Sequence, residues 1–344
     1  MTPARVGIWE PNIDDNGAPE RCLRHTIRAL EKQDVEVIHG SSEPVTTEFD
    51  HVTAKNANAF VKQSGVEVVH WNKTMDTTVP KRLSVPTVLT YHGDIQWEIP
   101  ALNYGAHPYL NSIKERLVDL AKLWQYDAVC FVSNDLKQRM LRRFSPLLSN
   151  VEVTHNAPAP RFAPDTSTNH LSAQFVEEPY IFHLSAYSRR KNPENLLKGY
   201  AASTQQHDLV IGGGGWEHMH DRVSELGIED KVHFLGYVPN EHLPQLYTNA
   251  ELFLFPSYHE CFGLPPLESM ACGTPPVVSD AYSLPEVVDD AGFYCQPNDH
   301  TSIADAIDRA VENTQTKKPI QRAATFTWES TATQLIKIYT RLCH

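Results

Sequence analysis

Residues 250–280 read AELFLFPSYHECFGLPPLESMACGTPPVVSD, and this stretch decides how the second half of the chain is interpreted. Its two apolar runs are typical of buried strands. Between them, a Gly-Leu-Pro-Pro turn is flanked by Glu260 and Glu268. Proline is tolerated in the first turn of a helix, because the N–H that it lacks has no partner there. The stretch therefore predicts strand, loop, short helix and strand, with Gly273 ending the helix in a left-handed conformation.

The predicted helix start is suited to an anion. The amide groups of Gly263 and Leu264 lie at its N-terminus, which attracts phosphate. Carboxylates repel phosphate but accept hydrogen bonds from sugar hydroxyls. Glu268, expected in about the first helical turn, would accept from a ribose diol, and Glu260 from a second sugar. The group describes a nucleotide-sugar site, and the alternative for either acid alone is a helix-start acid or a solvated loop residue.

The rest of the chain alternates short β-branched runs with amphipathic segments, the pattern of parallel α/β sheets. Strands are expected at 5–9, 35–38, 66–71, 87–92, 128–132 and 151–155, and then at 180–185, 209–213, 231–236, 251–255 and 275–279. Helices are expected at 20–33, at 109–124, after Ser133 as N-cap, and at the C-terminus. Residues 156–179 are rich in Pro, Ala, Ser and Thr and read as a linker.

This organisation predicts the α/β class, with two doubly wound, Rossmann-like domains facing a central cleft. Residues 1–165 form the first domain and 175–325 the second, while 326–344 form a helix that packs back on the first domain. A chain of 344 residues is long enough for two such cores.

Composition narrows the class of partners. The formal net charge is −12, which disfavours general nucleic-acid binding because that requires a basic surface. No run of about 18 apolar residues is present and the N-terminus lacks a signal-peptide pattern, so a cytoplasmic protein is expected. The six cysteines form no CxxC pair, which favours reduced thiols over a disulfide frame or a zinc site. No metal site is expected.

The stretch 255–280 resembles the signature of the family 4 retaining glycosyltransferases, with its paired-glutamate E-x7-E motif. The similarity covers nearly all of residues 179–300 and is thinner over the first half. It implies the GT-B fold of two Rossmann-like domains, with acceptor binding in the first and a nucleotide-sugar donor in the second. It also implies no obligatory catalytic metal and no cofactor beyond that co-substrate.

The resemblance assigns catalytic roles to four residues. Glu260 would orient the donor hexose, and His92, at the end of a first-domain strand, would lie close to the transferred sugar. Arg190 and Lys191, in SAYSRRKNPENLL, would neutralise the departing diphosphate. For the basic pair the alternative is a solvated turn, and for His92 a structural role.

Further positions are assigned to binding. Donor-side residues are expected at Phe262, Gly263, Leu264, Glu268 and Tyr237, the last touching the base through its backbone or ring. Gly17 and Ala18 occupy the place of the family's Gly-Gly acceptor loop. Ala18 replaces the second glycine of that loop.

The RKN sequence at 190–192 resembles mannosyltransferases of surface-polysaccharide pathways. GDP-mannose is therefore the first expectation for the donor and a UDP-hexose, such as one carrying glucose, the second. The acceptor would be a glycan or a lipid-linked saccharide. A lipid-linked acceptor would bring residues 137–144 to the inner face of the membrane, although a solvated helix face also explains this basic run.

Parts of the sequence are also compatible with two other functions. The stretch LVIGGGGWEHMH at 209–220 resembles a dinucleotide loop, as in an NAD-dependent oxidoreductase. However, His218 stands where the third glycine should be, and no acid follows the next strand. The second is a non-catalytic nucleotide-sugar-binding protein, which the combination of both glutamates with the basic pair disfavours.

Overall fold

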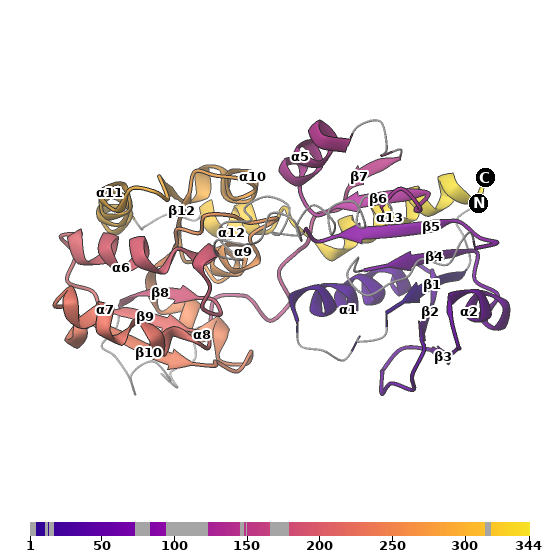
Figure 1. The fold of residues 1–344 in the computed structure, drawn as a ribbon, viewed down its shortest axis with the longest axis horizontal. Helices are drawn as coiled ribbons and strands as arrows, with labels where there is room; N and C mark the ends of the chain where they lie inside the picture. The colour runs from indigo at the N-terminus through magenta and orange to yellow at the C-terminus, as the bar shows by residue number, and fades with distance from the viewer. Residues whose placement is uncertain are drawn as a thin grey trace, which may run out of the picture. The chain divides into compact units, whose positions relative to one another are not determined.

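The chain divides into two compact units (Figure 1). The computed structural model describes residues 5–10, 13, 17–72, 83–93, 123–144, 148, 150–165, 179–313 and 318–344. The first unit comprises Met1–Asn156 together with Thr327–His344, and the second comprises Ala157–Phe326.

The first unit is built on a parallel sheet. Its strands are β1 (Arg5–Trp9), β2 (Glu36–Ser41), β3 (His51–Thr53), β4 (Val68–Trp71), β5 (Thr87–Tyr91), β6 (Ala128–Phe131) and β7 (Val151–Val153). Their order across the sheet is β3-β2-β1-β4-β5-β6-β7. The described helices are α1 (Ala18–Glu31), α2 (Ala57–Ser64), α5 (Asn134–Phe144) and α13 (Trp328–Cys343).

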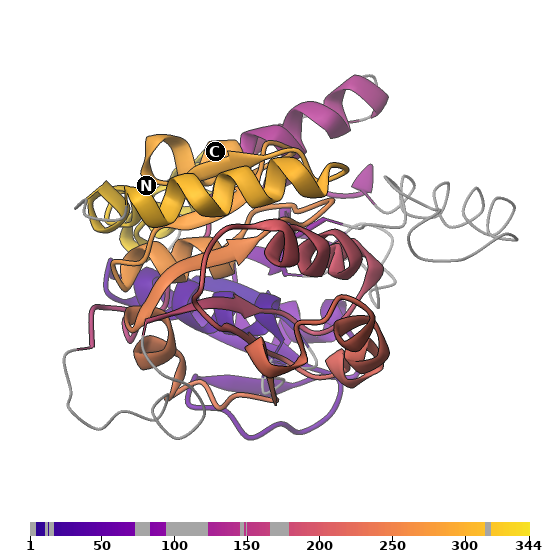
Figure 2. The same ribbon diagram turned by 90° about the vertical axis from the view of Figure 1, so that its left-hand side faces the viewer.

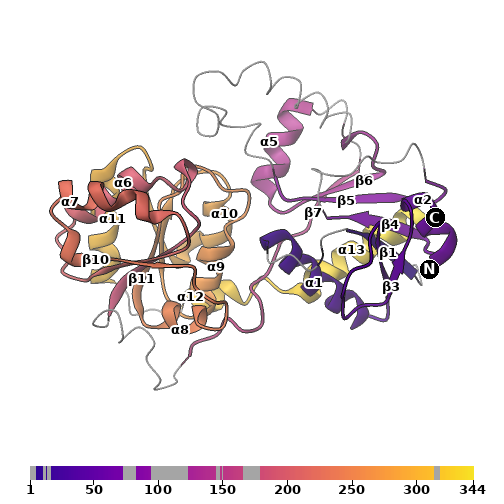
Figure 3. The same cartoon turned by 60° about the horizontal axis from the view of Figure 1, so that its bottom comes forward.

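Helix α13, the last element of the chain, is part of the first unit and lies beside α1 (Figure 3). Trp328 stacks on His25 of α1, with ring centroids 5.4 Å apart. Further along, Tyr339 is hydrogen-bonded through its hydroxyl to His70 of β4. Burial, with a smaller effect of nearby His92, lowers the pKa of His70 to about 3. This ring is therefore neutral, and it ties α13 to the sheet.

The second unit repeats the topology with another parallel sheet. Its strands are β8 (Tyr180–Leu184), β9 (Leu209–Gly212), β10 (Val232–Gly236), β11 (Ala250–Phe255), β12 (Pro276–Ser279) and β13 (Phe293–Cys295), in the order β10-β9-β8-β11-β12-β13. The helices are α6 (Pro193–Ala202), α7 (His220–Glu225), α8 (Leu243–Thr248), α9 (Leu264–Ala271), α10 (Leu284–Val288), α11 (His300–Glu312) and α12 (Lys318–Ala323). They can be followed around the sheet in Figures 2 and 3.

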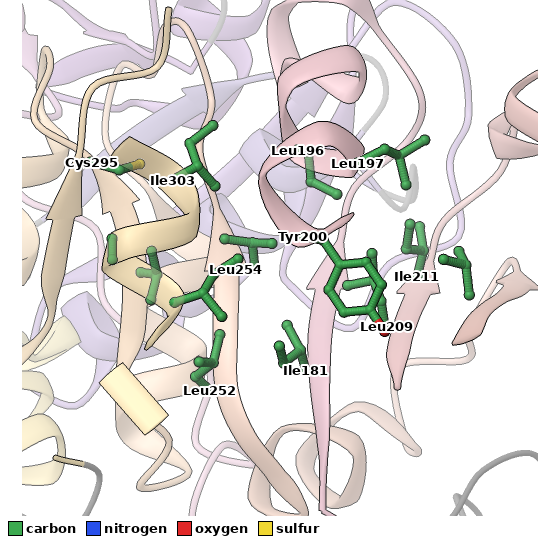
Figure 4. Close-up of a cluster of buried hydrophobic side chains, with 14 of the residues drawn as sticks. Ile181, Leu196, Leu197, Tyr200, Leu209, Ile211, Leu252, Leu254, Cys295 and Ile303 are labelled. Carbon is green, nitrogen blue, oxygen red and sulfur yellow. The ribbon is translucent and has the colours of Figure 1, made fainter. Parts of the chain in front are cut away.

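Alternate strand residues of the second sheet enter two separate cores, as the two-residue period of a strand requires. On one face, Ile181 and Leu254 join side chains of α6 and α11, among them Leu196 and Ile303 (Figure 4). On the other face, aromatic side chains dominate: Phe182, Phe253 and Tyr247 of α8 pack with ring centroids 5.2 to 5.9 Å apart. Both faces are thus covered, as a fully parallel sheet requires.

In both units the order reverses beside the first strand, between β1 and β4 and between β8 and β11. Loops diverge at such a point, so ligands of doubly wound sheets bind outside the carboxyl ends of these strands. In the second unit, a ligand site is therefore expected at the carboxyl ends of β8 and β11.

The sequence-based expectations for the elements are largely confirmed. All eleven expected strands are present, and two further strands, β3 and β13, were not predicted; each has three residues and lies at a sheet edge. The helix expected at 20–33 is α1. The amide of Leu136 donates to Ser133 Oγ at 3.1 Å, so Ser133 caps α5. The helix expected at 109–124 falls almost wholly outside the described residues.

Of the helices that the structure describes, none combines the length and the apolar character needed to cross a lipid bilayer.

The glycine-rich loop after β9 contains a position that admits no side chain. Gly213 has φ +114°, and a Cβ there would lie 1.9 Å from the carbonyl oxygen of Ser185. Its neighbour Gly214 faces open space. We expect Gly213→Ala to lower the free energy of unfolding by at least about 2 kcal/mol. Gly214→Ala, the matched control, should change it by less than about 0.5 kcal/mol. Urea denaturation measures both, and equal effects would contradict this view of the loop.

Candidate functional site

Two loops at the carboxyl edge of the second sheet bring opposite charges together. The loop after β8 ends in a single 3-10 turn, Arg189–Lys191, directly before α6. The loop after β11 carries Glu260. Lys191 Nζ lies 2.7 Å and Arg190 Nη1 2.9 Å from the same carboxylate oxygen, Glu260 Oε1. Residues 69 or 70 positions apart thus form one ion cluster at the switch point of the sheet.

A third donor completes the environment of Glu260 Oε1. The hydroxyl of Ser257 donates to this oxygen at 2.7 Å. Within the described part of the chain, the structure gives no hydrogen bond or ion pair to the other oxygen, Oε2. Glu260 and Lys191 are both 8% exposed. The protein therefore holds the carboxylate by one oxygen and leaves the second for a ligand.

The charge state of Glu260 follows from these contacts. Burial by itself raises the pKa of a carboxyl group, because it disfavours the charged form. Here Lys191 and Arg190 outweigh burial, and with the hydrogen bonds of Lys191 and Ser257 they lower the pKa of Glu260 to about 2. A carboxylate with such a pKa is a hydrogen-bond acceptor at neutral pH and too weak a base to remove a proton from a hydroxyl group.

The cationic turn is fixed by Asn192. This residue has a left-handed backbone, φ +60°, and is 1% exposed. Its Nδ2 donates to the carbonyl oxygens of Pro256 at 2.9 Å and Pro297 at 2.7 Å. The amide of Tyr258 in turn donates to Arg190 O at 2.8 Å. These bonds join the loop after β8 to the loops after β11 and β13, so the cations and Glu260 are held together before any ligand binds.

Ser283 fixes the loop between Glu260 and α9 by hydrogen bonds to two of its carbonyl oxygens. Its Oγ lies 2.8 Å from Phe262 O and 3.1 Å from Glu260 O. The ring of Phe262 is 4% exposed and packs edge-to-face on Phe326, at 5.8 Å between centroids. Phe262, an expected donor-binding residue, can therefore meet a ligand only through its backbone.

Helix α9 begins as the sequence indicates. Gly263 is its N-cap, with φ +115° and no side-chain cap, and a Cβ there would lie 2.9 Å from Leu284 Cδ2. Pro265 and Pro266 have no N–H, so Leu264 supplies the amide of the first helical residue. The left-handed Gly273, φ +95°, follows the helix as predicted.

Glu268, expected in about the first turn of the helix, is the fifth residue of α9 and follows the first turn directly. Its side chain is buried, and Oε2 accepts a hydrogen bond from the hydroxyl of Tyr247 at 3.3 Å.

Tyr237 lies at the same edge of the sheet, two strands away from β8. It follows β10 and the left-handed Gly236, and it is 73% exposed. Such an exposed ring beside the ion cluster's edge is available for contact with a planar group.

The remaining expected residues lie in the first unit. His92 follows β5, and its Nε2 is hydrogen-bonded to Asn72 Oδ1 at 3.0 Å. Asn72 follows β4 and donates through Nδ2 to Pro19 O at 2.9 Å. Pro19 is in the first turn of α1, directly after Gly17, the N-cap, and Ala18. Asn72 thus connects His92 to the helix start that was predicted to be the acceptor loop.

Sequence reasoning missed the residues that support the candidate groups of each unit, Asn72 in the first unit and Asn192, Ser257 and Ser283 in the second. A usable signal existed for two of them. Asn72 is the first residue after β4 and Ser257 the second residue after β11, at carboxyl ends of strands where ligands bind. The partners of Asn192 and Ser283 are fixed only by tertiary folding.

The dinucleotide interpretation of the loop at 209–220 is not favoured. In a Rossmann unit the phosphate-binding glycines follow the first strand, whereas this loop follows β9, the second. Gly213 is required by its approach to Ser185 O, and the loop continues into a 3-10 turn, Trp216–Met219.

Comparison with known proteins finds that the chain is similar to group 1 glycosyltransferases. The family described as "Glycosyl transferases group 1" matches residues 168–326. O-antigen chain mannosyltransferase B of Escherichia coli is 32% identical over 247 residues, which are 67% of this chain. The chain spans 64% of that relative's length, slightly under two thirds.

Solved structures show the fold. Sucrose-phosphate synthase of Thermosynechococcus elongatus superposes with a TM-score of 0.79 over 98% of both chains, at 20% identity. HepE of Anabaena, solved in complex with UDP and glucose, gives a TM-score of 0.76 at 18% identity, over 98% of this chain and 100% of that one. The expected α/β fold, GT-B with two Rossmann-like domains, is confirmed.

The depressed pKa of Glu260 predicts a pH-dependent contribution to stability. The pKa is lower in the folded than in the unfolded state, so the contribution is complete above about pH 5 and is lost as pH falls from about 4.5 towards 2. We expect Glu260→Gln to reduce the free energy of unfolding at pH 7 by on the order of 3 kcal/mol, and by progressively less below pH 5. Urea unfolding between pH 3 and 8 measures the difference. Glu225→Gln, which breaks an exposed ion pair with Arg222, is the control.

Proposed function

We propose that the chain is a retaining, metal-independent hexosyltransferase that moves a sugar from a nucleotide-sugar to a saccharide acceptor. The proposal rests on how the protein contacts the carboxylate of Glu260. Ser257, Arg190 and Lys191 all contact Oε1, and Oε2 is left to accept a hydrogen bond from a ligand. Cations for a diphosphate and an acceptor for a sugar hydroxyl thereby stand side by side.

The donor would lie along the carboxyl edge of the second sheet. Arg190 and Lys191 would bind the diphosphate, joined by the amide of Leu264 at the uncapped start of α9. Glu260 Oε2 would accept a hydroxyl of the hexose, and Glu268 a ribose hydroxyl. Tyr237, exposed at the end of β10, would contact the base.

The second unit would act mainly on the leaving group. As the bond between the anomeric carbon and the diphosphate breaks, its electron pair passes to the phosphate oxygen. Preorganised cations stabilise that developing charge, and each such donor contributes on the order of 3 kcal/mol. Arg190 and Lys191 are already fixed by Asn192, so they need little reorganisation.

The acceptor hydroxyl would then attack from the face that the diphosphate leaves, which retains the anomeric configuration. Its proton would pass to an oxygen of the departing phosphate. Glu260 is unsuited to this task, because its pKa of about 2 makes it a poor base. His92 is proposed to contact the transferred sugar, and Gly17 and Ala18 the acceptor.

Two nucleotide-sugars are the proposed donors. The relative O-antigen chain mannosyltransferase B is named for mannose transfer, which supports GDP-mannose. HepE is described with UDP and glucose, which supports a UDP-hexose as the second candidate. A glycan or a lipid-linked saccharide is the proposed acceptor.

We expect one donor to stabilise the protein strongly. A ligand present at 100 times its dissociation constant adds about 2.7 kcal/mol to the free energy of unfolding. Thermal unfolding with GDP-mannose, UDP-glucose and NADH will identify the class, and NMR of the product will give its anomeric configuration. Stabilisation by NADH alone would refute the proposal, and a product with inverted configuration would refute the retaining mechanism.

Loss of either charged partner should lower turnover far more than loss of a nearby surface charge, when the rates are compared for folded protein. Lys191→Ala and Glu260→Ala should each lower kcat at least tenfold, because each removes a group in contact with the donor. Lys198→Ala is the matched control, since Lys198 is on helix α6 and, among the described residues, pairs with Glu194 alone, at 4.0 Å. Rates equal to wild type in both site variants would contradict the assignment.

A further inference from the structure

We infer that Glu260 also distinguishes the intact donor from the nucleoside diphosphate product, and so promotes product release. The inference rests on the proposed function. It adds a second role for the carboxylate: once the hexose has left, the negative charge of Glu260 weakens the binding of the remaining diphosphate.

Arg190 and Lys191, the proposed ligands of the diphosphate, both contact Glu260 as well. Glu260 Oε1 is 2.7 Å from Lys191 Nζ and 2.9 Å from Arg190 Nη1. A diphosphate cannot contact these two cations without also coming close to the carboxylate. The cluster holds two positive charges and one negative, so its net charge is a single positive. Its attraction for a diphosphate is weaker than that of a free Arg-Lys pair.

Glu260 keeps its negative charge at neutral pH, and salt screens this charge poorly. Glu260, Lys191 and Arg190 have side chains that are 10%, 10% and 25% exposed. Interactions between partly buried charges are reduced less by salt than those on an open surface. Glu260 remains ionised at neutral pH because the two cations and Ser257 favour its charged form.

Only the intact donor can offset the repulsion between the Glu260 carboxylate and the diphosphate. Glu260 Oε2 has no protein partner within the described residues, so it can accept a hydrogen bond from a hexose hydroxyl. A hydrogen bond to a charged group contributes more than one between neutral groups. Transfer removes that hydroxyl together with the hexose. The product then retains the repulsion without the compensating bond.

A purely structural role for Glu260 predicts something different. If the carboxylate served only to hold Lys191 in place, its neutralisation would weaken donor and product alike. If it also distinguishes them, neutralisation should strengthen product binding and leave donor binding equal or weaker. The ratio of the two dissociation constants therefore separates the two roles.

The experiment is isothermal titration of wild type, Glu260→Gln and Glu194→Gln. The probes are GDP with GDP-mannose and UDP with UDP-glucose, whichever pair the wild type binds. In Glu260→Gln we expect the nucleoside diphosphate to bind at least tenfold more tightly and the nucleotide-sugar no more tightly. Glu194→Gln is the matched control: it removes the same charge from the first turn of α6, where Glu194 pairs with Arg222, and should leave the ratio unchanged.

Neutralising Glu260 leaves Lys191 buried without its partner, so the single variant is liable to unfold. A second comparison avoids this difficulty. Lys191→Met and the double variant Lys191→Met/Glu260→Gln differ only in the carboxylate facing Arg190. The double variant should bind the nucleoside diphosphate more tightly than the single one.

Weaker or equal binding of the nucleoside diphosphate in both comparisons would overturn the inference while leaving the proposed function intact. A wild type that binds neither pair would remove the proposed function and the inference together.

Discussion

The site depends on the placement of one buried carboxylate. A charge removed from water is costly, and in this chain the cost is offset by two cations and a hydroxyl that all reach the same oxygen of Glu260. Those donors come from the loops after two neighbouring parallel strands, β8 and β11. The ion cluster therefore does two things at once: it joins the loops and it orients the unused oxygen.

The two units follow the same topology but offer different chemistry at their carboxyl edges. The second unit presents fixed charges, which suit an anionic ligand. At the corresponding edge of the first unit, the structure describes an imidazole and an amide, His92 and Asn72, joined by a hydrogen bond. Imidazole and amide side chains can form hydrogen bonds with hydroxyl groups of a ligand. A shared fold thus carries two distinct surfaces, as expected where function depends on loop residues rather than on the sheet.

The strands of the sheet and the charged residues could be predicted from the sequence, but the side chains that hold those charged residues in place could not. Apolar runs such as 250–255 and the Pro-Pro turn carry local signals, so the strand, the loop and the start of α9 could be predicted. The left-handed Asn192 gives no such signal, because its two carbonyl partners are 64 and 105 residues away. The hydrogen bond from the Tyr247 hydroxyl to Glu268 could not be predicted either, because Tyr247 is 21 residues away in the chain.

The place of α13 in the first unit has a consequence for biosynthesis. Residues 327–344 complete a unit whose other part ends at Asn156, and the whole second unit lies between them in the chain. On the ribosome, the second unit can acquire its core as soon as it emerges. The earlier sheet must wait, with the β4 surface around His70 uncovered, until Tyr339 has been synthesised. The half of the molecule that is translated first is therefore the last to complete its contacts.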